Sequence, residues 1–419
     1  MNLVAPTRVH RGLAQHTIRA GDALSRAPWW VQALLVWLAS RLWAGVIFAV
    51  VDRQAPTGPW GPTPLGYFNF MTIWDGQWYQ SVHDAGYPAE LPRDAAGTVQ
   101  PNAWAFFPVF PLLVRGITAF TGLPWAVTAS TVALLAGFGA AVLILKLFRD
   151  ILPNGAALWA LAVVAFGPAS PVFQTAYAES LHLAMLAGVL LLVLRGQVLW
   201  SVGLILLMCL TRPAGVPFAA ALGLTWLIHA VGHLGRARAA GTLQVGTVPA
   251  VFNKWFWLAV WACVCAMLWP AFAWAVTGEI GAYTDTETAW RGSSLLVFEP
   301  WLALGNRFFG PALGWLAVLV VIVVFFLLIT TRVVRQTLPL VVWMWVACYA
   351  VYLLAFLHPQ SSTFRMLIPL FVLAAPLVAA SPSRSYRITL VVVGALFQIV
   401  WIGYLWQWSP LPGGGDWPP

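Results

Sequence analysis

The residues with the clearest potential for chemistry surround Asp75, in a stretch rich in tryptophan and tyrosine. If this stretch is a helix, four apolar or aromatic side chains fall within roughly 60° of the acid. They are Met71, Trp78, Tyr79 and Val82. A carboxylate on an apolar face is partly desolvated and can take up a proton near neutral pH, as a general base must. The alternative is an interfacial helix whose Asp75 only reaches toward water, although the polar side already carries its own acid, Asp84.

Three arginines stand near those ends of apolar runs that we assign to the outer membrane face: Arg115, Arg212 and Arg365. A guanidinium offers a planar fork for two phosphate oxygens, so these residues are candidates for binding the phosphate of a lipid-linked donor. His358 lies in the same short loop as Arg365 and could donate to the same anion. The alternative for each arginine is a side chain that extends to the lipid headgroups.

A second set of residues could line a sugar site. Glu179 opens an apolar run, and His182 follows three residues later on the same helical face. Trp74, Trp78 and Tyr79 could stack on sugar rings. Purely structural roles stay open for all five, because an acid is favoured at a helix N-terminus and aromatic residues are enriched at membrane interfaces.

The composition identifies a membrane protein. Of the 419 residues, 61% are hydrophobic and only 8% are charged, and the mean hydropathy is +0.81. The net charge of +9 comes mainly from arginines in short loops between apolar runs. This is the positive-inside pattern of membrane proteins and excludes a nucleic-acid interface. The four cysteines lie inside apolar runs and have no partner at metal spacing, so neither a zinc site nor a disulfide framework is predicted.

We therefore expect an all-α polytopic protein with about eleven spans. They are predicted at 30–51, 124–147, 155–173, 179–194, 198–211, 214–231, 255–277, 311–331, 338–357, 365–380 and 388–407. The basic segment 1–29 is expected in the cytoplasm, the catalytic unit covers 30–407, and the tail 408–419 is external. Two long external loops are expected at 52–123 and 278–310. Within the first, the apolar run 105–115 is interrupted by two prolines, so we interpret it as a short interfacial or re-entrant helix.

Arg41 lies near the middle of the first predicted span. An unpaired charge at this depth costs at least roughly 2.5–3.5 kcal/mol, so the side chain must face a cavity or a partner. A structural role that ties spans together is the simpler interpretation. The sequence does not identify the partner.

Several stretches, taken together and in this order, resemble the PIG-V-like branch of integral-membrane GT-C glycosyltransferases. They are Trp74-Asp75-Gly76-Gln77-Trp78-Tyr79, Phe106-Phe107-Pro108-Val109-Phe110-Pro111-Leu112, Ala176-Tyr177-Ala178-Glu179-Ser180, Thr211-Arg212-Pro213-Ala214-Gly215 and Phe364-Arg365-Met366-Leu367-Ile368-Pro369-Leu370. The eukaryotic relatives of this branch are the second mannosyltransferases of GPI-anchor assembly. Where the last motif more usually has Arg-Tyr, this chain has Arg365-Met366.

The resemblance implies a GT-C-type bundle that transfers a sugar, with mannose the first choice, from a polyprenyl-phosphate donor with inversion. It also implies that Asp75 is the catalytic base, at the extracytoplasmic face. The acceptor would be a hydroxyl of a lipid-linked glycan or glycolipid. No cofactor is required by the sequence. A divalent ion held through Asp75 or Glu179 is compatible with phosphate chemistry but has no further support.

Only two of the 22 basic residues are lysine, a bias typical of GC-rich bacterial genomes, so we expect a bacterial cytoplasmic (inner) membrane. Two functions from other classes stay open: a secondary transporter or lipid flippase, and a non-catalytic subunit of another glycosyltransferase. A transporter is disfavoured because no repeat and no acid near a span centre was found. The identity of the acceptor, the choice of sugar and the oligomeric state also stay open.

Overall fold

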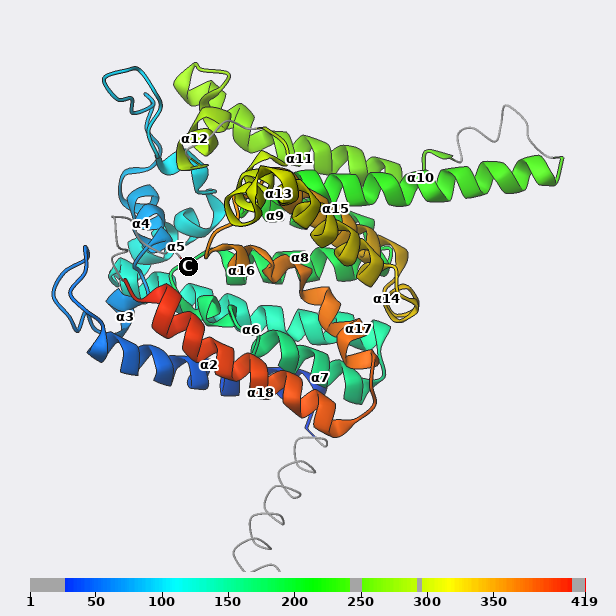
Figure 1. Cartoon of the computed structure of the whole chain (residues 1–419), viewed down its shortest axis with the longest axis horizontal. Coiled ribbons are helices and arrows are strands. Elements are labelled where there is room, and N and C mark those ends of the chain that lie inside the picture. The colour runs from blue at the N-terminus through cyan, green and yellow to red at the C-terminus, as the bar shows by residue number, and fades with distance from the viewer. Residues whose placement is uncertain (1–26, 242–250, 292–295, 409–418) are drawn as a thin grey trace, which may run out of the picture.

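The computed structural model describes residues 27–241, 251–291, 296–408 and 419, and this part of the chain is almost entirely helical, without a β-sheet (Figure 1). Most of segment 1–29, residues 292–295 of the second predicted loop and most of the tail lie outside the described residues. Within the described residues, six helices are long and apolar enough to cross a membrane. They are α2 (Trp29–Gln54), α6 (Trp125–Ile151), α10 (Gly215–Ala239), α11 (Lys254–Thr277), α13 (Glu299–Ile329) and α18 (Arg384–Val400), which continues to Trp406. The predicted all-α polytopic class is therefore confirmed.

The other five predicted spans are also helical but shorter. They correspond to α7 (Asn154–Ala165), α8 (Glu179–Leu194), α9 (Val198–Cys209), α15 (Leu340–Phe356) and the pair η5 (Ile368–Leu373) and α17 (Ala374–Ala379). A 12-residue helix such as α9 is about 18 Å long, less than the roughly 30 Å of a bilayer core. The total of eleven spans thus stays a prediction. α5 (Val109–Thr121) is a separate short apolar helix that begins directly after Pro108, as expected for the run 105–115.

Helix α6 lies at the centre of the bundle, where it packs against α2 and α8. The approach of α2 is close because α6 presents Gly137 to the ring of Trp37. A Cβ atom on Gly137 would lie 2.9 Å from the indole nitrogen of Trp37. Trp37 is fully buried and stacks on Phe173, with 5.2 Å between ring centroids.

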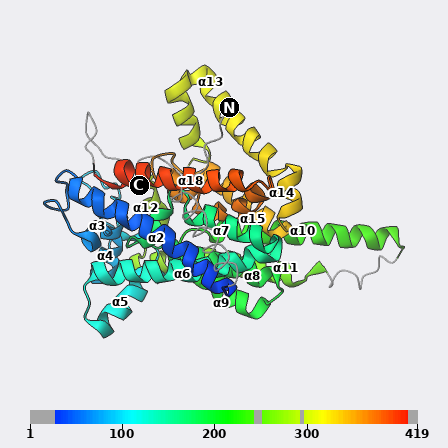
Figure 2. The same cartoon turned by 90° about the horizontal axis from the view of Figure 1, so that it is seen from below.

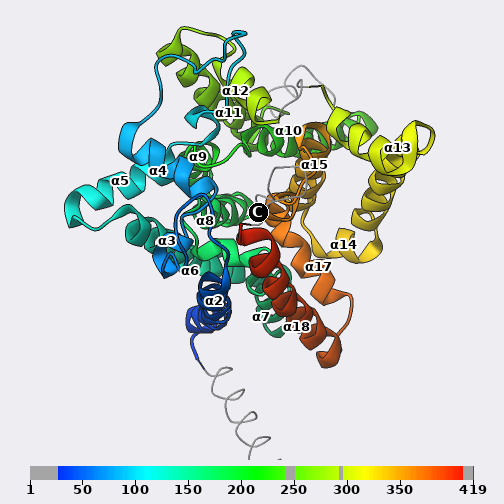
Figure 3. The same cartoon turned by 60° about the vertical axis from the view of Figure 1, so that its left-hand side comes forward.

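The short helices of the two predicted external loops gather at one end of the bundle. α3 (Tyr67–Phe70), α4 (Asp75–Ala85), α5 and α12 (Ala282–Arg291) lie at the left in Figure 1, and Figure 3 brings this end forward. α14 (Arg332–Thr337) and the far end of α10 lie at the opposite end. The two predicted external loops pack together, because Asn102 exchanges hydrogen bonds with Thr286 and its carbonyl accepts one from the Trp290 indole at 3.1 Å.

Helix α7 ends earlier than the sequence indicated. We expected a span over 155–173, but the helix stops at Ala165, before Gly167 and Pro168. The helix stops because proline lacks a backbone N–H and disfavours a helical conformation in the residue before it. We predicted a longer span because the residues after this break are also apolar. The chain then runs through the short 3-10 helix η2 (Ser170–Gln174) to α8, and residues 169–178 are all buried.

Arg41 satisfies the carbonyl groups that this break exposes. Its guanidinium donates to the carbonyl of Ala165 at 2.8 Å and to both the carbonyl and the hydroxyl of Ser170. Gln398 of α18 donates to the same hydroxyl at 2.9 Å. Irregular backbone in a membrane is tolerated only where such partners exist. Arg41 is thus the structural tie that we considered, and its partner is the main chain.

Helix α13 is two helices joined at a sharp bend. Gly310 has φ 74° and ψ 163°, and Pro311 begins the second arm. Figure 2 shows the arms folded back on each other. They meet at two glycines, since a Cβ atom on Gly305 would lie 2.5 Å from the carbonyl oxygen of Gly314. The predicted boundary at 310/311 is the bend, but the residues before it, from Glu299 onward, are helical instead of loop.

Candidate active site

The chain turns sharply just before Asp75. Trp74 has φ 61° and ψ −125°, a conformation that residues with a side chain rarely adopt, and such positions often mark functional sites. Trp74 is held in this turn because its indole nitrogen donates to the carbonyl of Trp406 at 2.6 Å. Asp75 is consequently the first residue of α4. Our expectation that Met71 shares its helix is wrong, since the helix begins only after the turn.

The Asp75 carboxylate is paired with an arginine from the other end of the sequence. Its Oδ2 atom lies 2.6 Å from Nη1 of Arg365, in the short helix α16 (Thr363–Met366). The side chains are 21% and 4% exposed, respectively. The carboxylate that we expected on an apolar face therefore has a direct charged partner. Of the three candidate arginines, Arg365 is the one that contacts Asp75.

Glu179 links this pair to a second arginine. Its Oε1 atom lies 3.1 Å from Arg365 and 3.2 Å from Nη1 of Arg212. Arg212 also donates to the hydroxyl of Tyr79 at 3.5 Å and approaches the sulfur of Met366 at 3.2 Å. The side chains therefore form one row, Asp75, Arg365, Glu179 and Arg212, in which negative and positive charges alternate and cancel. Arg212 is the more exposed of the two arginines, at 16%.

Tyr177 contacts both members of the Asp75 pair, and we had not identified it as a site residue. The hydroxyl accepts a hydrogen bond from the backbone N–H of Asp75 at 3.0 Å. The ring lies 4.9 Å below the guanidinium carbon of Arg365, a cation–π contact. The sequence indicated Tyr177 only as part of a motif, because the neighbouring residues do not show which group its hydroxyl would contact.

These groups open into a cavity of about 470 Å³, a size typical of small-molecule sites. Seven of the residues that we singled out line it: Asp75, Tyr79, Glu179, His182, Arg212, His358 and Arg365. Burial raises the pKa of Tyr79 to about 12, so its hydroxyl stays protonated near neutral pH. The cavity thus combines a carboxylate, two arginines and aromatic walls.

Three predicted residues do not line the cavity. Arg115 is exposed on α5 and does not line the cavity, so it is not placed to bind a phosphate there. Trp74 is held at the turn behind Asp75. Trp78 supports the wall from outside, since its ring stacks on Phe106 with 5.9 Å between centroids.

Helix α12 contributes three more cavity residues: Glu287, Trp290 and Arg291. The sequence placed them in the second external loop, where Trp290 was one of several aromatic residues that could stack on a sugar, but it did not assign the ion pair to the site. Glu287 and Arg291 form an ion pair at 3.4 Å, one helical turn apart. Burial raises the pKa of Glu287, while the neighbouring Arg291 acts in the opposite direction. Their spacing of four residues was a usable signal for a shared helix face, but nothing local indicated that this face points toward Asp75.

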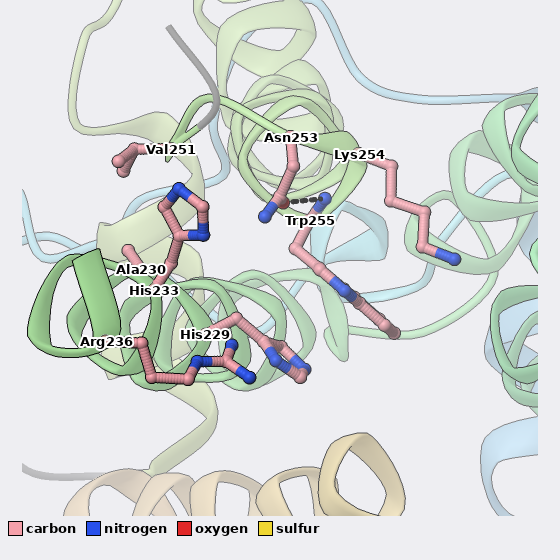
Figure 4. A pocket seen from close by; sticks show the side chains of 8 residues that line it. All are labelled: His229, Ala230, His233, Arg236, Val251, Asn253, Lys254 and Trp255. Carbon is pink, nitrogen blue, oxygen red and sulfur yellow. Dashed lines mark hydrogen bonds between the residues drawn. The ribbon is translucent and has the colours of Figure 1, made fainter. Parts of the chain in front are cut away.

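A second cavity, also of about 470 Å³, lies where the end of α10 meets the start of α11 (Figure 4). His229, His233 and Arg236 of α10 face Asn253 and Trp255, with Lys254 at the edge. The described residues that line it include no carboxylate. None of the candidate site residues lines it. The two cavities lie near opposite ends of α10, since the Asp75 cavity includes Arg212, Pro213 and Ala214, directly before this helix begins.

The carboxylates of the main cavity pair with arginines and are not arranged to bind a metal ion. Among the described residues, no group of three or more His, Cys, Asp or Glu side chains could hold a metal ion. Asp75 and Glu179, the two carboxylates considered for a divalent ion, converge on the guanidinium of Arg365, a cation that would repel a metal. We therefore derive no step through a metal.

Comparisons with known proteins leave the family undetermined. No protein-family model and no curated protein matches the chain. Among solved structures, the chain is similar to the crystal structure of the Archaeoglobus fulgidus oligosaccharyltransferase in complex with zinc and sulfate, with 13% identity and a TM-score of 0.33. The match covers 87% of this chain and 49% of that chain, so this chain spans about half its length. This TM-score is too low to support an argument, so function must be inferred from the cavity.

Proposed function

We propose that this chain is a membrane glycosyltransferase that moves a sugar from a polyprenyl-phosphate donor to a hydroxyl of a lipid-linked or glycolipid acceptor. The observation that carries the proposal is the Asp75 carboxylate in a cavity that also holds Arg365, Glu179 and Arg212. Mannose is the sugar we propose, by resemblance to the PIG-V-like branch. We further propose that the site opens at the extracytoplasmic face of a bacterial inner membrane.

In the proposed reaction, Asp75 accepts the proton of the acceptor hydroxyl while the hydroxyl oxygen attacks the anomeric carbon of the donor. The bond between this carbon and the phosphate oxygen breaks, and the polyprenyl phosphate leaves with the electron pair. Attack from the face opposite the leaving group inverts the anomeric configuration. A proton acceptor and a nearby guanidinium are the two groups that this step needs from the protein.

The two arginines are suited to different tasks. Arg365 is 4% exposed and already bound to Asp75, so we assign it to orienting the base. Arg212 is 16% exposed, which supports a direct contact with the donor phosphate. Of the arginines that the sequence made candidates for the phosphate, we therefore propose Arg212 for that contact.

The test is the variant Asp75→Asn, which keeps the shape of the side chain and removes the proton acceptor. We expect a loss of transfer by about 10²–10⁴-fold. Purified protein in lipid vesicles would be supplied with radiolabelled polyprenyl-phosphate mannose and bacterial membrane lipids, and the labelled products would be separated. Asp84→Asn is the matched control, because Asp84 lies on the same helix with a 57% exposed side chain. Full activity of Asp75→Asn would rule out the proposed base.

A further inference from the structure

A second charged pair faces the same cavity from helix α12. We call Glu287, Trp290, Arg291 and the neighbouring Tyr352 of α15 the α12 wall. The Glu287 and Arg291 side chains are each 19% exposed and lie 3.4 Å apart, so both retain access to the cavity. No step of the proposed transfer uses them.

The position of Trp290 in this wall is fixed by its surroundings. Its indole nitrogen donates to the carbonyl of Asn102 at 3.1 Å. Its ring meets the rings of Trp78 and Phe106 edge to face, with 4.9 Å and 5.5 Å between centroids. Trp290 nevertheless remains 37% exposed, so an oriented aromatic surface is available beside the ion pair.

The chemistry of the wall matches a neutral saccharide. A carboxylate accepts and a guanidinium donates hydrogen bonds, so the pair can bind neighbouring sugar hydroxyls at once. An aromatic ring covers the apolar face of a sugar. A lipid chain would bring no hydrogen-bonding group to the pair, and a phosphate would meet a carboxylate as well as a guanidinium, which together carry no net positive charge.

The wall lies where an acceptor would extend from the base. Asp75 and Trp78, which contacts Trp290, are three residues apart on α4, a rise of about 4.5 Å. The donor phosphate belongs at Arg212 instead. An acceptor whose hydroxyl meets Asp75 can therefore place its next sugar against α12.

We propose that the α12 wall is a saccharide subsite that holds the acceptor, so the acceptor is a glycan with a neutral sugar next to the reacting hydroxyl. This inference rests on the proposed function, and it selects a glycan over a protein acceptor. Glu287 and Arg291 bind the sugar hydroxyls, and Trp290 supplies the stacking surface. None of these residues takes part in the chemical step.

Two measurements test the subsite. The first detects binding of mannotriose and maltotriose to the protein in nanodiscs, without donor, by saturation-transfer NMR. The second measures transfer from radiolabelled polyprenyl-phosphate mannose to mannotriose, which offers a second sugar beside the reacting one. For Glu287→Gln and Arg291→Gln we expect at least fivefold weaker trisaccharide binding and at least a fivefold higher acceptor KM, with the donor KM changed less than twofold.

The matched controls are Glu279→Gln and Arg93→Gln. This ion pair has the same charges and lies among the same loops, but its side chains are each 40% exposed and do not line the cavity. We expect both controls to behave like the unaltered protein. A higher donor KM in the Glu287 variant, or no change in either KM, would overturn the proposal. So would transfer by a protein that binds neither trisaccharide. If trisaccharide binding depends on Glu287 but no sugar is transferred, the subsite stands and the proposed transferase activity fails.

Discussion

At the scale of single residues, Tyr177 decides how Asp75 and Arg365 meet. Its hydroxyl fixes the backbone of the acid, and its ring supports the guanidinium of the arginine. Burial raises the pKa of Tyr177 well above its usual value near 10, so the hydroxyl stays protonated. Tyr177 therefore positions the two charged groups and does not exchange protons itself.

We predict that Tyr177→Phe lowers kcat about tenfold and leaves the donor KM within about twofold. The change removes the hydrogen bond from the Asp75 N–H and a longer one to the Ile73 carbonyl, together worth roughly 1–1.5 kcal/mol, and keeps the ring beneath Arg365. Tyr177→Leu also removes the cation–π contact and should raise the donor KM. Initial rates at varied donor concentration measure both constants. Tyr386→Phe, which loses a hydroxyl contact to Leu377 on α17, is the control, and equal rates for the two Phe variants would contradict the positioning role.

The sequence predicted much of this site but not its pairing. The motif around Asp75 and the isolated Arg365 stood out because charged groups are rare in apolar runs. Their contact joins residues 290 positions apart, and no periodicity carries information over that distance. The same holds for Arg41, whose partners are main-chain carbonyls that exist only because α7 ends early.

At the scale of elements, the break after α7 brings Tyr177 and Glu179 to the cavity. The Gly167-Pro168 pair was a readable stop signal, and the apolar residues that follow it concealed the stop. Long helices such as α6 were predicted well because a run of apolar residues is sufficient evidence for them. The short helix α8 was also predicted to the residue, at 179–194. The end of α7 was not, because the irregular segment after it depends on distant neighbours such as Arg41 and Gln398.

We predict that Gly394→Ala in α18 destabilises the protein by about 1–3 kcal/mol. A Cβ atom there would lie 2.4 Å from the carbonyl oxygen of Phe166, in the broken segment, and a backbone atom cannot move aside easily. Thermal unfolding in detergent should show a lower midpoint. Gly403→Ala is the control, since nothing lies within 4 Å of its added methyl group. Equal midpoints would mean that α18 does not pack tightly on the break.

At the scale of the whole molecule, the bundle has two chemically different ends. α4, α5 and α12 form the end with the cavity, and the basic helix α14 lies at the other end (Figure 1). The acids support this polarity, because eleven of the thirteen are assigned to the predicted external face. The orientation in a membrane follows from the positive-inside rule and stays a prediction.

The orientation can be tested with single cysteines. In a background without the four native cysteines, we expect Glu90→Cys to react with a membrane-impermeant maleimide on intact spheroplasts and Arg335→Cys to react only in inverted vesicles. Both positions are exposed. Glu90 follows α4, and Arg335 lies on α14, at the opposite end of the bundle. The opposite labelling pattern would place the cavity in the cytoplasm. Such a result would exclude the proposed extracytoplasmic reaction while leaving the cavity itself unaffected.

The contact between Trp74 and Trp406 has a consequence for biosynthesis. The turn that presents Asp75 is held by a carbonyl 332 residues further along the chain, and the Trp406 indole returns a hydrogen bond to Phe70 at 3.0 Å. A ribosome delivers Trp74 long before Trp406. The turn that presents Asp75 therefore lacks this contact until Trp406 has been made. A nascent chain would thus carry the acid early and acquire a working site only when synthesis is nearly finished.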